Sequence, residues 1–233
     1  MNLPDPEHYS NGVQFFRDSH KIILQVCVEL ERLLDDAETR GVFQSFAKDP
    51  AWSDVFQFME RAAPSHERQE QELVFPLVAE HVPHVGFQQP DSTIRFLIEG
   101  HEILIRKMIP LMKDWEVFLR IPQGDAAIET AHEKHPKEDA AFLANGRELI
   151  KLYREHIALE EERVYRVADK VLSGEEKFEL AENIRDANSS EQLTGIYQFE
   201  EPRFSDPTYN VQYIPTEAIS EDAIEPEEEE EEE

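Results

Sequence analysis

Two stretches of the sequence place a histidine four residues before a glutamate. The pairs are His66 with Glu70, in S-H-E-R-Q-E-Q-E-L-V-F-P, and His156 with Glu160, in E-H-I-A-L-E-E-E-R-V-Y. Residues four apart on a helix stack one turn above the other on one face. Both pairs continue an apolar stripe, so each should face a core, where unpaired polar groups are costly. Imidazole and carboxylate side chains together are typical ligands of divalent metal ions. The repeated pattern therefore favours a metal site over a satisfied core histidine.

Two further segments each carry one histidine in the middle of an apolar stripe, His20 and His101. Apolar residues recur around them at alternating intervals of three and four, the spacing of a helix that packs in a bundle. The first stripe is Val13, Phe16, His20, Ile23, Cys27, Leu30 and Leu34, and the second is Ile94, Leu97, His101, Leu104, Met108, Leu111 and Trp115. The candidate metal ligands are therefore His20, His66, Glu70, His101, His156 and Glu160.

Four long helices must position these side chains. We expect them at about residues 10–40, 52–81, 92–120 and 137–172, with kinks at Pro64 and Pro110 because an internal proline removes a backbone hydrogen bond. The stripe of the second helix reads Val55, Met59, Ala62, His66, Glu70, Leu73 and Leu77, and that of the fourth includes Leu149, Tyr153, Val164, Val167 and Val171. The fold class is all-α, an antiparallel up-down four-helix bundle.

The rest of the chain is expected to be peripheral to this bundle, which occupies residues 1–172. Residues 173–189 should form a short capping helix, and 190–233 an extended segment that becomes a disordered acidic tail. The last 44 residues hold 15 acidic residues against the single basic Arg203, half of the net charge of −28. Such a charge repels phosphates and anionic lipids, so neither nucleic acid nor membrane is expected as a partner.

Two absences in the sequence narrow the setting. No apolar run approaches the roughly 18–20 residues that span a membrane, and the first residues lack the pattern of a signal peptide. Cys27 is the only cysteine, so an intrachain disulfide and a thiolate cluster are both excluded. A cytoplasmic location is therefore expected.

The candidate ligands cannot readily satisfy one another by hydrogen bonding alone. Neutral imidazoles and ionised carboxylates need donors that the apolar stripes do not supply. Iron, manganese and zinc all accept this set of ligands, and two carboxylates suit a pair of ions.

At these residues the sequence resembles the hemerythrin-like (HHE cation-binding) family, over about residues 10–172. The resemblance rests on the lone His20 and His101, on H-E-R-Q-E-Q-E-L-V-F-P at 66–76 and on H-I-A-L-E-E-E-R-V-Y at 156–165. It implies a non-haem site with two iron ions. In that site His66 and His156 would be terminal ligands, and Glu70 and Glu160 would bridge the ions.

The chain departs from the oxygen-carrying members of this family. They have another histidine four residues after the one on the third helix, where this sequence has Ile105, and a longer spacing on the last helix. The chain is more similar to the branch with four histidines and two glutamates, which includes iron–sulfur repair di-iron proteins, although it lacks their cysteine-bearing N-terminal segment. The resemblance implies binding of, or reaction with, dioxygen, peroxide or nitric oxide. Iron storage or donation, and a metal-free interaction bundle acting through its acidic tail, remain alternatives; a redox partner is not identified.

Overall fold

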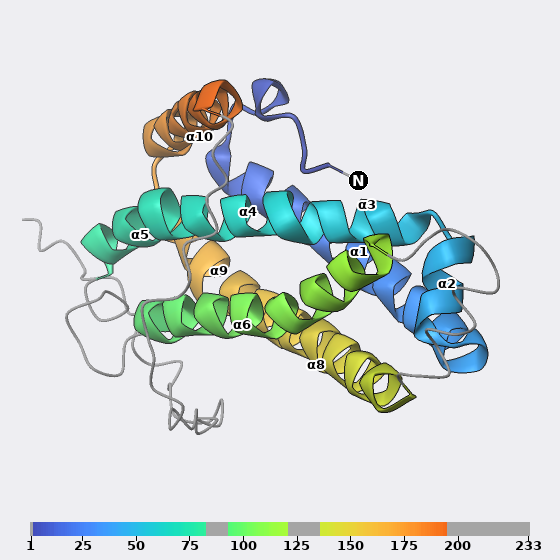
Figure 1. Ribbon diagram of the computed structural model, residues 1–233. Helices are drawn as coiled ribbons and strands as arrows, with labels where there is room; N and C mark the ends of the chain where they lie inside the picture. Colours follow the sequence, from blue (N-terminus) through green and yellow to red (C-terminus); the bar gives the residue numbers. More distant parts are fainter. Residues whose placement is uncertain (1, 83–92, 121–135, 195–233) are drawn as a thin grey trace, which may run out of the picture. The chain divides into compact units, whose positions relative to one another are not determined.

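The computed structural model describes residues 2–82, 93–120 and 136–194, and every regular element in these ranges is helical (Figure 1). The described helices belong to one compact unit. They are η1 (Pro6–His8), α1 (Gly12–Arg40), α2 (Val42–Lys48), α3 (Ala51–Gln57), η2 (Phe58–Ala62), α4 (Ala63–Gln69), η3 (Glu70–Val74), α5 (Phe75–His81), α6 (Thr93–Leu119), α8 (Pro136–Glu160), η5 (Glu161–Tyr165), α9 (Arg166–Val171) and α10 (Gly174–Thr194).

These elements form an all-α bundle, as the sequence predicts. The elements from α3 to α5 run without a break and make one long helix, and α8, η5 and α9 make another. Helix α8 packs against both α1 and α6, while α1 also contacts α3 and α4, and α5 contacts α9 (Figure 1). All four expected long helices are therefore present. The connections at 83–92 and 121–135 and the acidic segment from residue 195 onward lie outside the described residues.

Capping residues fix the ends of the first long helix. The side chain of Asn11 accepts a hydrogen bond from the backbone N–H of Gln14, as an N-cap does. The helix ends at Gly41, whose φ of 93° lies in a region that other residues rarely adopt. The chain then turns into α2, a short helix that the sequence analysis did not predict.

Helix α10 corresponds to the expected capping helix and is longer than predicted. It packs against α1 and η1, and Arg185 donates a hydrogen bond to the backbone oxygen of Tyr9. Within the described residues, no helix is both long and apolar enough to cross a membrane.

Three of the elements, η2, η3 and η5, are single π-turns inside the long helices. In each, a backbone N–H bonds to the oxygen five residues back, for example from Phe75 to Glu70. Two of these turns end two residues before a proline, Pro64 or Pro76. A proline ring clashes with the carbonyl four residues earlier, and here that carbonyl lies within the wider turn. Pro110 instead lies inside α6, which changes direction along its length in Figure 1.

The π-turns correct part of the predicted core. Each adds one residue to a turn; at η3 and η5 the buried stripe moves by one position, whereas at η2 only Ala62 is displaced and His66 and Glu70 stay buried as predicted. Ala62, Leu73, Leu77, Val167 and Val171 were expected in the core but are only partly buried, and their neighbours Ala63, Val74, Val78, Ala168 and Leu172 are buried instead. The stripes of α1 and α6, which contain no π-turn, keep the predicted register except that Trp115 is partly buried.

The core consists of two apolar clusters. One is rich in aromatic rings and uses the helices from Ile23 to Ala37, from Val42 to Ala63, from Leu104 to Phe118 and from Phe142 to Ile157. The other uses residues nearer the start of α1 and the ends of α5 and α9. On every long helix, buried polar side chains fall between the two clusters in sequence: Ser19, His20, Ser65, His66, Glu67, Gln69, Glu70, His101 and Glu160. A polar layer therefore interrupts the apolar core.

Candidate metal centre

The structure brings all the predicted ligands together in the polar layer. His20 comes from α1 and His101 from α6, while the two histidine–glutamate pairs come from α4–η3 and from α8. Five of the six side chains are at most 2% exposed, and His156 is 8% exposed. The helical spacing of four residues keeps each histidine beside the glutamate that follows it.

The six residues form two groups of the same composition. One is His20, His66 and Glu70, and the other is His101, His156 and Glu160; within each group, one ligand atom per residue lies within 4.8 Å of the others. In the first group, Oε1 of Glu70 is 3.2 Å from Nε2 of His20 and 3.4 Å from Nε2 of His66. In the second, Oε1 of Glu160 is 3.2 Å from Nε2 of His101 and 3.0 Å from Nε2 of His156.

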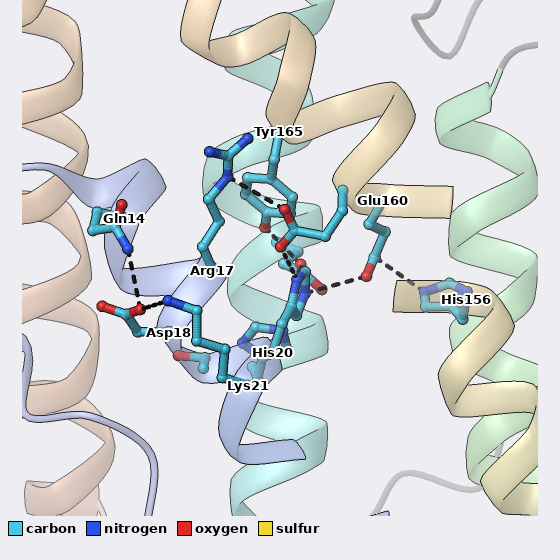
Figure 2. A network of polar contacts seen from close by, with 12 residues as sticks. Gln14, Arg17, Asp18, His20, Lys21, His156, Glu160 and Tyr165 are labelled. Carbon is cyan, nitrogen blue, oxygen red and sulfur yellow. Dashed lines mark hydrogen bonds and ion pairs between the residues drawn. The ribbon is translucent and has the colours of Figure 1, made fainter. Parts of the chain in front are cut away.

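Each glutamate also reaches the other group. The second oxygen of Glu70, Oε2, lies 3.4 Å from Nε2 of His101, and Oε2 of Glu160 lies 3.3 Å from Nε2 of His20. Figure 2 shows the contact of Glu160 with His156 on one side and the imidazole of His20 on the other. Each carboxylate therefore spans the two groups, one oxygen to each, as a carboxylate shared by two ions does.

Several buried atoms of this layer have no hydrogen-bond partner. Among the candidate ligands they are both ring nitrogens of His66, Oε2 of Glu70 and Nε2 of His156, which is near Glu160 without hydrogen-bond geometry. Oε2 of Glu67 and Oε1 of Gln69 are unpaired as well. An unpaired buried polar atom costs about 1–3 kcal/mol. Lone pairs of imidazole nitrogens and carboxylate oxygens are what a divalent cation requires, so the residues present fit a pair of metal ions.

A comparison with protein-family models gives the same assignment. The model of the hemerythrin HHE cation-binding domain matches residues 11–168. The chain belongs to this family. The matched range covers the first three long helices, the fourth as far as Ala168, and every residue of the two groups. No curated protein and no solved structure matched the chain.

Within this hemerythrin domain, the residue that follows Glu70 or Glu160 contacts the Nδ1 of a candidate histidine ligand, on the side of the ring away from the glutamates. Nδ1 of His20 lies 2.7 Å from Oε1 of Glu161, and Nδ1 of His101 lies 2.8 Å from Nε2 of Gln71. The sequence analysis named neither residue. The signal in the sequence was that each residue directly follows a candidate glutamate. Only the structure shows that both residues face the histidines.

Two tyrosines bond to carboxylates of the layer. The hydroxyl of Tyr165 donates to Oε1 of Glu70 at 2.6 Å, and that of Tyr153 donates to Oε1 of Glu67 at 3.1 Å. Burial and the nearby Glu70 and Glu160 raise the pKa of Tyr165 well above 10, so this hydroxyl keeps its proton. Tyr165 therefore orients Glu70 and helps to hold its charge.

The metal-free layer is a strongly coupled set of charges. Burial opposes charge on every member, but contacts with Glu160, Glu161 and Glu70 raise the pKa of His20 well above 6.5. Burial lowers the pKa of His66 to about 4, because that imidazole has no hydrogen-bonded carboxylate. Both ring nitrogens of His20 face carboxylates, so the metal-free ring is an imidazolium that must lose a proton to become a ligand.

One glycine makes room for the fourth histidine. A Cβ at Gly100, next to His101 on α6, would lie 2.6 Å from Nδ1 of His156. Any side chain there would displace the imidazole. The absence of a Cβ therefore helps α6 and α8 to approach at the site.

Proposed function

We propose that this hemerythrin domain is a non-haem di-iron protein that binds or reacts with a small molecule such as dioxygen, peroxide or nitric oxide. His20, His66 and Glu70 would hold one ion, and His101, His156 and Glu160 the other. The proposal places the ligands in an antiparallel four-helix bundle in the cytoplasm.

The observation that carries the proposal is the position of the two glutamates. Each places one oxygen in each histidine group, and several buried atoms of the site, among them both ring nitrogens of His66, lack hydrogen-bond partners. When bound in such a site, a pair of iron ions supplies Lewis acidity and exchangeable coordination positions for a small ligand.

Burial supports a small ligand over a bulky substrate. The cluster side chains are at most 8% exposed, and the most exposed of them is His156. A diatomic molecule or a peroxide needs far less space than an organic substrate. We expect it to enter beside His156.

Ile105 favours reactivity over reversible carriage of dioxygen. It supplies no ligand atom at the position where the oxygen carriers of the family have a histidine, and it is partly buried on α6. The chain therefore offers two imidazoles for each ion, and coordination positions stay free on both.

Metal analysis of untagged protein, purified without chelators, tests the proposal. We expect about two iron ions per chain and, after anaerobic reduction, consumption of peroxide or dioxygen without a long-lived oxygenated form. Stoichiometric zinc without iron, or no metal, would contradict it. Iron uptake and release without turnover of peroxide or nitric oxide would instead indicate storage or donation.

A further inference from the structure

In two places of the polar layer, a pair of consecutive residues contacts both ring nitrogens of one histidine. Glu70 contacts Nε2 of His101 and the next residue, Gln71, contacts its Nδ1. In the same way, Glu160 contacts Nε2 of His20 and the next residue, Glu161, contacts its Nδ1. In both cases the contacted histidine comes from another helix than the two residues that contact it.

Each pair of contacts coincides with a π-turn. Turn η3 begins at Glu70 and η5 begins directly after Glu160, so each pair of contacts lies where the helix widens. Consecutive residues of a helix point about 100° apart, and two of them can reach opposite sides of one ring only if that ring stands close to the helix. The two places are thus equivalent in position.

They differ in chemistry. Glu161 is a carboxylate that can only accept a hydrogen bond, whereas Gln71 is a neutral amide. Glu161 also has an ion-pair partner, since its Oε2 lies 3.3 Å from Nε of Arg17, a residue labelled in Figure 2. Nη1 of Arg17 in turn lies 2.7 Å from Oδ2 of Asp169. Arg17 therefore fixes the direction of the carboxylate toward His20.

A carboxylate behind a metal-binding histidine fixes the tautomer of the ring and raises the donor strength of its other nitrogen. An amide oxygen fixes the tautomer without adding a full charge. The amide of Gln71 must turn to place its oxygen, not its nitrogen, against the Nδ1–H of a metal-binding His101.

We propose that Glu161 and Gln71 are positioning residues of the centre, and that Glu161 makes the position of His20, His66 and Glu70 bind its ion more tightly than the other. This inference rests on the proposed metal function. Tyr165 donates to the Glu70 oxygen of this position. That oxygen keeps a second lone pair, so the hydrogen bond leaves it able to bind an ion.

The test is a stepwise anaerobic titration of the metal-free full chain with ferrous iron, followed by Mössbauer spectroscopy. We expect two dissociation constants about 10–100-fold apart, one signal at one equivalent and two signals at two equivalents. Glu161→Gln should weaken the tighter step, and Gln71→Glu should tighten the weaker one. In either variant the two constants should converge.

The double variant, with Glu161→Gln and Gln71→Glu together, should restore the separation by exchanging the positions. A purely structural role would not predict such a rescue. Glu162→Gln is the matched control, because it removes the same charge from the next residue, which is exposed and forms an ion pair with Arg163.

Two results would separate the possible failures. If the parent chain takes up no iron, the proposed function fails and this inference with it. If it binds two ions but Glu161→Gln behaves like Glu162→Gln, or the two steps are equal from the start, only the inference is overturned.

Discussion

The aromatic cluster and the polar layer are neighbouring parts of one core, but they differ in how fully their buried polar atoms are hydrogen-bonded. Phe46 lies between rings that approach to centroid distances of 4.8 Å (Trp52) and 5.1 Å (Phe118). The indole N–H of Trp52 is paired with Ser45. The polar layer, in contrast, leaves nitrogens of His66 and an oxygen of Glu70 unpaired. In the aromatic cluster the chain satisfies its own polar groups, whereas the polar layer leaves buried atoms that could bind a metal ion.

The largest expected effect separates the glutamates from the histidines. Glu70→Ala or Glu160→Ala should lose nearly all bound metal, because each carboxylate reaches both groups. Changing one histidine to alanine, for example His20→Ala, should lose less. Metal per chain, measured by elemental analysis, gives the ranking. If His20→Ala or His101→Ala is as damaging as Glu160→Ala, the glutamates are not shared.

A truncation in the aromatic cluster should have the reverse profile. Phe46→Ala is expected to lower the free energy of unfolding by about 3–5 kcal/mol, since it removes a buried ring from a packed cluster. Metal content should stay unchanged at temperatures where the variant is folded. Chemical denaturation and elemental analysis of the same sample check both parts. Metal loss in the folded variant would mean that the two regions are not separable.

His66→Leu should sharpen the comparison by stabilising the metal-free chain. The imidazole of His66 is buried with both nitrogens unpaired, and its pKa is lowered to about 4, so it is neutral near pH 7. Removing these unpaired atoms should raise the free energy of unfolding by about 1–3 kcal/mol in the presence of a chelator.

In the presence of iron the variant should instead be less stable than the parent chain, because it lacks one of the proposed ligands. Denaturation with and without chelator measures both. A variant that is less stable than the parent chain even with chelator would show that His66 contributes packing that leucine cannot replace.

The smallest effect is expected at Cys27, in the aromatic cluster on α1. Burial raises the pKa of this thiol to about 12, and reaction with thiol reagents requires the thiolate. Labelling of the native chain should therefore be very slow at pH 8, increase with pH, and be complete only after unfolding. Iron should not change the native rate. Fast labelling at pH 8 would mean that this part of the core opens locally.

The sequence predicted which candidate ligands come together more accurately than it predicted the core that surrounds them. Candidate ligands were found because charge and imidazole stand out against an apolar stripe of regular spacing. The stripes of α1 and α6 were also correct, since an uninterrupted helix preserves its period. After Glu70 and after Glu160 the predicted stripe was wrong by one residue.

A π-turn changes the register without any characteristic residue type, so spacing alone could not show it. Pro64 and Pro76 mark two of the three turns, but a proline predicts a kink as readily as a wider turn. Gln71 and Glu161 were missed because each points about 100° away from the glutamate before it, and only the packing of the helices shows which histidine it contacts.

Each π-turn is equivalent to one residue inserted into an α-helix, and this determines where a change of chain length is tolerated. Deleting a single residue within η5 would let the helix close into regular α-turns, and the residues beyond it would keep their faces. Ala168 and Leu172 would therefore stay in the core. The same deletion in the middle of α1, which contains no π-turn, would rotate everything beyond it by about 100°. Relatives of this chain that differ by one residue in a long helix should therefore differ at a π-turn.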